Sequence, residues 1–121
     1  ALPQPLITPV SMLPEEIRTM LVGKELLDFG LQVQPGTFAF HDTHCVAPTS
    51  LVMAYVLAIA ASGKVSRILM AGFDGYPAGD TRNAETAEIL TAFAQVSSDA
   101  IVSLTPTSHA IKTVSVYGQT I

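Results

Sequence analysis

The amino-acid sequence predicts an α/β fold in which helices alternate with the strands of a mostly parallel sheet. Apolar runs of strand length recur along the chain, and most are separated by segments with helical spacing. The run at 65–73 lacks the apolar–polar alternation of a half-exposed strand, which indicates a central strand covered on both faces. We therefore expect a three-layer, Rossmann-like domain with right-handed crossovers, present here as a fragment of a larger domain.

Each expected element rests on a local pattern. Strands are expected at 5–12, 25–33, 65–73 and 99–106, helices at 11–23, 48–63 and 79–96, a long connection at 34–48, and a turn with a short strand at 107–121. Pro14, Glu15 and Glu16 favour a helix start, because proline fits the first turn and carboxylates favour its positive end. The helix at 48–63 is apolar nearly all round and should be buried on most sides. Asp80 is the favoured N-cap of the last helix.

Length and composition narrow the class of protein. The 121 residues suffice for one α/β domain, 1–121, and a chain with 49% hydrophobic and only 13% charged residues is apolar for a small domain. The low charge indicates that a partner, a second copy of the chain or absent chain covers some surface. Because the sequence starts almost directly in an apolar run, we expect an excised fragment of a longer protein.

The same composition argues against several classes. A net charge of −4 with scattered basic residues argues against nucleic-acid binding. The longest apolar run, 51–61, is well short of the roughly 20 residues that span a bilayer, so no membrane segment is expected. Cys45 is the single cysteine, which rules out an internal disulfide and makes a reducing, cytoplasmic setting the simplest interpretation.

The first candidate site is AGFDGY, residues 71–76. It follows a strand, which is where open α/β sheets bind ligands, and its two glycines let backbone approach a ligand or adopt a positive φ. Asp74 is expected either to accept hydrogen bonds from sugar or ribose hydroxyls or to bond backbone N–H groups within its own turn. Tyr76 could stack on the same ligand or donate a hydrogen bond to it.

The second candidate is the stretch FHDTHC, in which His41, Asp42, His44 and Cys45 are all metal-ligand types. The stretch lies in an expected loop and no second cluster supports it, so we expect no metal and no cofactor in this chain. A Cys–His nucleophile is conceivable, without an assignable oxyanion site. We expect the histidines and Asp42 to form a polar loop at the same sheet edge as Asp74, where the histidines donate or exchange protons.

The third candidate is the start of the helix at 48–63, where Thr49 and Ser50 place hydroxyls beside free N–H groups. Such a helix end binds phosphate or carboxylate, and ordinary capping is the favoured interpretation. The segment TPTSH, residues 105–109, follows the last strand and could close the same edge as AGFDGY. His109 alone is more typical of a surface or partly buried residue than of a catalyst.

Several stretches together resemble one protein family. PLITPVSMLPEEI, LLDFGLQV, FHDTHC, PTSLVMAYVLAIA, RILMAGFDGYPAGDTRNAE and SLTPTS…SVYG are similar to a C-terminal domain of certain bacterial aldolase-like proteins. Those proteins begin with a TIM barrel of the hydroxymethylglutaryl-CoA lyase and 4-hydroxy-2-oxovalerate aldolase type, and they are associated with surface-polysaccharide synthesis. Residues 48–76 are also distantly similar to Rossmann-like bacterial sialyltransferases that bind CMP-sugars. The Gly-Pro-Ser-type loop of both relatives does not occur in this chain.

The resemblance implies an accessory domain that binds a sugar, a nucleotide-sugar or a 2-oxo acid, or that docks against the barrel. The lyase residues and divalent metal of such a parent protein would belong to the barrel, so no catalytic residue is assigned here. The alternatives are a nucleotide-sugar-dependent transferase, in which a histidine takes a proton from the acceptor hydroxyl, and a module for homo-oligomerisation. The expected ligand-binding residues are Asp74, Tyr76, His41, Asp42, His44, Thr49 and Ser50.

Overall fold

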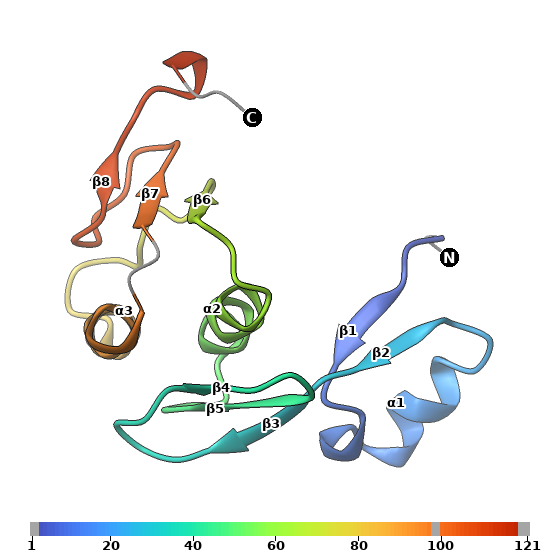
Figure 1. The fold of residues 1–121 in the computed structure, drawn as a ribbon. Coiled ribbons are helices and arrows are strands. Elements are labelled where there is room, and N and C mark those ends of the chain that lie inside the picture. Colours follow the sequence, from blue (N-terminus) through green and yellow to red (C-terminus); the bar gives the residue numbers. More distant parts are fainter. Residues whose placement is uncertain (1–2, 98–99, 119–121) are drawn as a thin grey trace. The chain divides into compact units, whose positions relative to one another are not determined.

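The structure, a computed structural model, describes residues 3–97 and 100–118 and shows a mixed α/β architecture (Figure 1). The strands are β1 (Leu6–Thr8), β2 (Leu26–Asp28), β3 (Gly30–Val33), β4 (Ala39–Phe40), β5 (His44–Ala47), β6 (Arg67–Met70), β7 (Ala100–Ser103) and β8 (Lys112–Thr113). The helices are α1 (Glu15–Met20), α2 (Val52–Ser62) and α3 (Thr81–Val96), with short 3₁₀ helices η1 (Val10–Met12) and η2 (Val116–Gly118). The strands form three small sheets with parallel pairs in each, so the predicted α/β class is confirmed.

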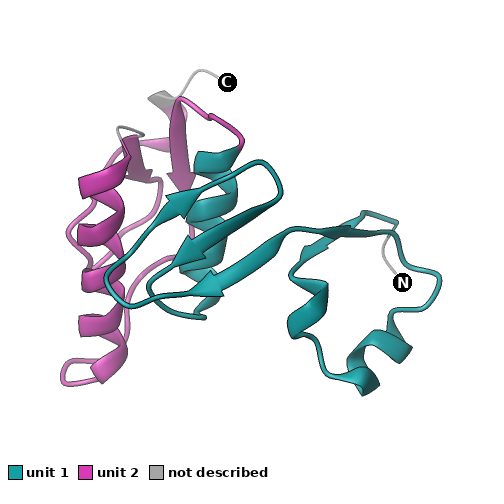
Figure 2. Cartoon of the chain, turned by 60° about the horizontal axis from the view of Figure 1, so that its bottom comes forward, with its two compact units in different colours: residues 1–62 teal, residues 63–121 magenta. Residues whose placement is uncertain are grey.

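The chain divides into two compact units, residues 1–62 (unit 1) and residues 63–121 (unit 2), which Figure 2 colours separately. Unit 1 holds β1 to β5 with α1, η1 and α2, and unit 2 holds β6 to β8 with α3 and η2. The predicted site residues are therefore distributed over both units. Unit 1 contains His41, Asp42, His44, Thr49 and Ser50, and unit 2 contains Asp74 and Tyr76.

In unit 1 the predicted strand at 25–33 is divided at Phe29 into β2 and β3, which belong to different sheets. The Phe29 amide donates to the carbonyl of Thr8, in the sheet of β1 (3.2 Å). The next amide, that of Gly30, donates to the carbonyl of Thr43, beside β5 (3.0 Å). The expectation of one continuous strand was wrong because neighbouring amides find their partners in two sheets.

The predicted connection at 34–48 contains an unpredicted strand, β5. This strand pairs in parallel with β3 and antiparallel with β4, so it is the central strand of its sheet. Cys45, Val46 and Ala47 are buried, which makes this short apolar run part of the core of unit 1. The local pattern is only four residues long, and the strand exists because two neighbours supply its hydrogen bonds.

Helix α2 packs against β4 and β5 within unit 1. Every position of the helix except Val52 and Val56 is buried or partly buried, so the helix is buried on most sides, as predicted. The hydroxyl of Tyr55 donates to the carbonyl of Phe29 (2.5 Å). This bond ties α2 to the residue at which the two sheets of unit 1 diverge.

In unit 2 the three strands form one parallel sheet with the order β6–β7–β8. The strand expected to be central, β6, is an edge strand of this sheet, and Ile68, Leu69 and Met70 are only partly buried. That expectation was wrong because β8 takes the free side of β7, which places β7 in the centre. The short strand expected within 107–121 is β8.

Helix α3 forms as its sequence predicts. Asp80 is the N-cap, and its carboxylate accepts a hydrogen bond from the amide of Arg82 (2.9 Å). Thr86, Ile89 and Phe93 are buried at helical spacing, which defines the packed face of the helix. Within 3–97 and 100–118, no helix is both long and apolar enough to cross a membrane.

Candidate functional site

Two loops of unit 2 meet beyond the carboxyl ends of β6 and β7. Because these strands are parallel, the β6–α3 loop (71–80) and the β7–β8 loop (104–111) leave the sheet at the same edge. The amide of Ser108 donates to the carbonyl of Asp74 (2.7 Å), which joins the two loops directly. The stretch TPTSH therefore closes the edge that carries AGFDGY, as its position after the strand predicts.

The approach of the two loops depends on Gly75. Its φ of +111° lies in a region that residues with a side chain rarely adopt. A Cβ atom at this position would overlap the side-chain oxygen of Ser108. The positive φ is one of the two roles expected for this glycine, and the structure adds the close approach of another loop of the same chain.

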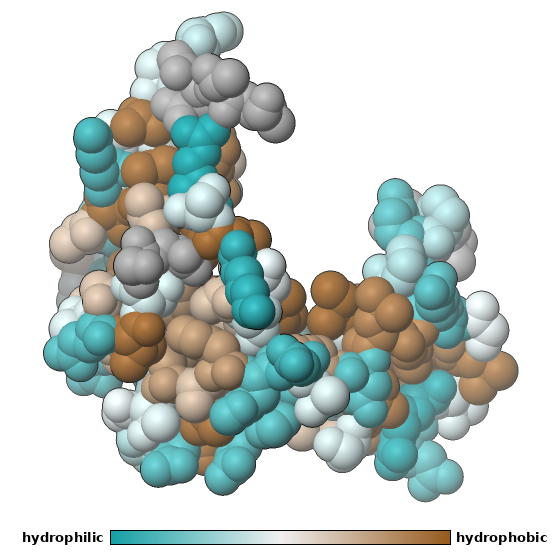
Figure 3. Space-filling model, in the orientation of Figure 1, coloured by the Kyte–Doolittle hydropathy of each residue, from teal (hydrophilic) through white to brown (hydrophobic). Residues whose placement is uncertain are grey.

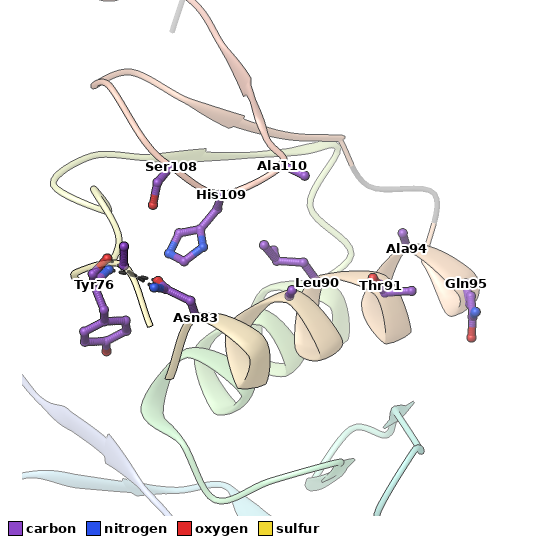
Figure 4. Close-up of a pocket in the computed structure, with 11 residues that line it drawn as sticks. Tyr76, Asn83, Leu90, Thr91, Ala94, Gln95, Ser108, His109 and Ala110 are labelled. Carbon is purple, nitrogen blue, oxygen red and sulfur yellow. Dashed lines mark hydrogen bonds between the residues drawn. The ribbon is translucent and has the colours of Figure 1, made fainter. Parts of the chain in front are cut away.

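A groove of about 820 Å³ runs along α3 from this edge (Figure 4). Its walls come from the β6–α3 loop, one face of α3 and the β7–β8 loop. The lining residues are Tyr76, Ala78, Asn83, Ala87, Leu90, Thr91, Ala94, Gln95, Ser108, His109 and Ala110. The volume lies within the roughly 300–1,000 Å³ that is usual for small-molecule sites.

His109 forms part of the wall that faces α3 (Figure 4). Its ring packs against Phe73 with ring centroids 4.8 Å apart, and its amide donates to Thr107 Oγ1 (3.2 Å). The Nε2 atom is buried and has no hydrogen-bond partner among the residues that the structure describes. A buried polar atom without a partner costs about 1–3 kcal/mol, so unit 2 carries an energetic cost at this wall.

Asn83 holds the β6–α3 loop in place instead of capping α3. Its Nδ2 donates to the carbonyls of Tyr76 and Pro77 (both 3.1 Å), and its Oδ1 accepts from the amide of Tyr76 (3.0 Å). These bonds fix Tyr76 at the end of the groove (Figure 4). The sequence did not predict this role of Asn83, because the loop that it holds is defined by tertiary contacts.

The described lining residues include no Asp, Glu, Lys or Arg. Arg82 is close by, 4.1 Å above the ring of Tyr76, but its charge is paired. Its Nη2 donates to Asp80 Oδ2 (2.7 Å) and its Nε donates to Asp80 Oδ1 (3.1 Å). Hydrogen bonds from Arg82 lower the pKa of Asp80 to about 2, so this pair stays ionised at neutral pH. The described lining of the groove therefore contains no carboxylate, lysine or arginine, and an ion pair lies beside it.

Asp74 does not line the same hollow as Tyr76. Asp74 lines a shallow hollow of about 410 Å³ with Pro106, Thr107 and Ser108, whereas Tyr76 lines the groove. Ser108 belongs to both, and the carboxylate-bearing residue Asp74 is exposed. The two residues predicted for one site thus serve two adjoining hollows.

In unit 1 a tight turn brings His41 and His44 together. The amide of His41 donates to the carbonyl of His44 (3.0 Å), and the rings stack with centroids 4.4 Å apart and an interplanar angle of 18°. Asp42 lies exposed between them, and no group of three metal-ligand side chains occurs among the described residues. The predicted position of this turn beside Asp74 stays a prediction, because Asp74 belongs to unit 2.

Cys45 is fully buried, and burial raises the pKa of its thiol. A nucleophilic cysteine needs a lowered pKa and partial exposure, which argues against the Cys–His nucleophile. Burial also raises the pKa of Tyr55 to about 12, with smaller contributions from Cys45 and Asp28. Both groups serve the core of unit 1.

Thr49 and Ser50 lie before α2, which begins at Val52 and not at Pro48 or Thr49 as predicted. The hydroxyl of Thr49 accepts a hydrogen bond from the amide of Leu51 (3.1 Å). This local bond occupies the hydroxyl in the turn that leads into the helix and explains the later start.

No protein-family model, curated protein or solved structure matches this chain. Sequence reasoning placed Ser108 at this edge as part of TPTSH, but it missed the face of α3 that lines the groove. The only local signals were Ala87 and Ala94, which are small residues at helical spacing, and the glycine at position 75.

Proposed function

We propose that this chain is an accessory, ligand-binding α/β domain of a bacterial aldolase-like enzyme and that unit 2 holds its ligand site. The observation that carries the proposal is the groove at the carboxyl edge of β6 and β7, where α/β proteins characteristically bind ligands. The resemblance to the C-terminal domains of aldolase-like proteins supports the choice of parent enzyme and its association with surface-polysaccharide synthesis. In this proposal the strands form part of a cytoplasmic, Rossmann-like domain.

The proposed roles follow from the positions of the side chains. Tyr76 binds the ligand at the end of the groove, and the Asp74 carboxylate accepts hydrogen bonds from hydroxyls at the adjoining hollow. The barrel of the parent protein supplies the lyase residues and a divalent metal, and this domain docks against it. The nucleotide-sugar transferase is the weaker alternative, because the cation nearest to Tyr76, Arg82, is already paired with Asp80.

Calorimetric titration of the chain with pyruvate, CMP, a CMP-sugar and neutral sugars tests the proposal. We expect heat with at least one class, and we expect Gly75→Ala to abolish it because an added Cβ separates the two loops. Gly72→Ala is the matched control, since Gly72 also has a positive φ but open space around its Cβ position. The absence of heat with every class would contradict the proposal.

Self-association is a second candidate function, supported by the exposed apolar side chains of unit 1. Met20 is 78% exposed and Val22 is 83% exposed, and apolar residues form a patch among polar ones over part of the region of β1, β2 and α1 in Figure 3. Burial of these side chains against a second copy would account for the low charge of the chain. Sedimentation at several concentrations tests this candidate, and a strict monomer at every concentration would contradict it.

A further inference from the structure

We infer that the groove of unit 2 binds a short, uncharged oligosaccharide along α3. This inference rests on the proposed ligand-binding function and narrows its ligand from three classes to one. The charge, the surface chemistry and the length of the groove each support this inference.

Charge disfavours the two anionic classes, nucleotide-sugars and 2-oxo acids. A phosphate or carboxylate needs an available cation or a set of convergent N–H donors, and the described lining contains no Lys or Arg. The Nε and Nη2 atoms of Arg82 donate to Asp80, whose carboxylate balances the charge of the guanidinium. Asp74, on the adjoining hollow that shares Ser108, adds a negative charge. Apart from the imidazole of His109, the described lining therefore offers an anion no side chain that can carry a positive charge, and the anion would lose its hydration for little electrostatic gain.

The surface chemistry of the groove suits a sugar ring, which has an apolar C–H face and an edge of hydroxyls. Ala87, Leu90 and Ala94 supply an apolar strip on α3, and Ala110 adds to it from the β7–β8 loop. Neutral hydrogen-bonding groups accompany this strip along its length. They are Tyr76, Thr91, Gln95 and Ser108.

The length of the groove favours more than one ring. The lining residues of α3 run from Asn83 to Gln95, and at about 1.5 Å per residue this span is about 18 Å. One sugar ring covers only part of such a span. We therefore expect affinity to rise from a monosaccharide to a trisaccharide of the same sugar.

A calorimetric titration with matched variants of α3 tests the inference. The probes are neutral trisaccharides built from glucose, galactose or mannose, the corresponding monosaccharides, pyruvate and CMP. Ala87→Phe fills the groove, and Ala84→Phe places the same side chain on an exposed position of the same helix outside the groove. We expect at least one trisaccharide to bind, with an affinity about tenfold lower in Ala87→Phe, or about 1.4 kcal/mol, and unchanged in Ala84→Phe.

Ala94→Phe provides a second test at the far end of the groove, and circular dichroism confirms that each variant is folded. A trisaccharide that binds less tightly to Ala94→Phe than to the original chain supports the inference. Binding of pyruvate or CMP that depends on Ala87, without binding of any trisaccharide, would overturn the inference and leave the proposed function intact. The absence of binding by every probe would overturn both.

Discussion

The two units differ in where their polar and reactive side chains lie. In unit 1 the residues with the most reactive side chains form a tight turn and a core: His41 and His44 stack across the turn, and Cys45 is fully buried behind it. In unit 2, small apolar side chains, neutral hydrogen-bonding groups and one histidine, His109, line a groove where two loops meet at one edge of a parallel sheet. The comparison teaches that strand topology can bring side chains together around a groove, whereas a cluster of reactive residue types in the sequence can fold into a turn and a core.

The largest expected effect tests whether Tyr55 serves the core of unit 1. Its pKa is about 12 in the folded chain and about 10 when unfolded, so the folded state holds the proton more tightly. The stability contribution is complete below pH 10 and is lost as the pH rises toward 12, a loss of about 2–3 kcal/mol. Urea unfolding of the original chain and of Tyr55→Phe between pH 9 and pH 12 measures this difference.

Tyr55→Phe is expected to remove this component of the pH dependence, since phenylalanine does not ionise. The other tyrosines stay in both proteins, so the difference between the two curves isolates Tyr55. If the free energies of unfolding of the two proteins changed with pH in parallel across this range, the buried position of the Tyr55 hydroxyl would be contradicted.

The next prediction concerns the loss of stability when the contact between the two loops of unit 2 is disturbed. Gly75→Ala combines a strained backbone with overlap against Ser108, and we expect it to lower the free energy of unfolding by about 2–3 kcal/mol. Gly72→Ala carries the backbone strain without the overlap, and we expect a loss of about 1 kcal/mol. Chemical denaturation of both variants gives the two values, and equal losses would show that the close approach to Ser108 does not constrain the fold.

A smaller change, an increase in the free energy of unfolding, is expected when His109 is replaced. Replacing it with phenylalanine keeps an aromatic ring against Phe73 and removes the buried Nε2 that has no described partner. We expect His109→Phe to raise the free energy of unfolding by about 1 kcal/mol. His109→Gln keeps a polar atom near the same place and should give no such gain. A loss of stability in His109→Phe that His109→Gln does not share would show that Nε2 is satisfied.

The smallest effect is expected at the histidine turn of unit 1. The joint replacement His41→Ala with His44→Ala removes the stacked rings from an exposed turn whose closing hydrogen bond is made by backbone atoms. We expect a change within about 0.5 kcal/mol and no change in ligand affinity. Loss of ligand binding in this variant would transfer the site to unit 1.

Helix α3 and its N-cap were predictable because their signals are local. Asp80 precedes the helix by one residue, and the buried Ile89 and Phe93 repeat at helical spacing. The strand β5 was not predictable, because HCVA is a short run after a polar turn and becomes a strand only through pairing with β3 and β4. The edge position of β6 likewise depends on where β8 pairs.

The candidate site was predictable only in part. The position of Tyr76 after a strand indicated the correct edge of unit 2, and TPTSH was expected to close that edge. The groove itself depends on Ser108 reaching Gly75 across more than thirty residues of chain, a contact that no local pattern encodes. The clamp made by Asn83 on Tyr76 depends on the same tertiary arrangement.

The most direct test of the central claim, that unit 2 holds the ligand site, is an amide chemical-shift titration of the isotope-labelled chain with a neutral trisaccharide. The account predicts that the shifts that change with saturation belong to residues around the groove, including Tyr76, Ala87 and His109, while the amides of His41 and His44 stay unchanged. Saturable changes confined to the His41–His44 turn, with none in unit 2, would contradict it.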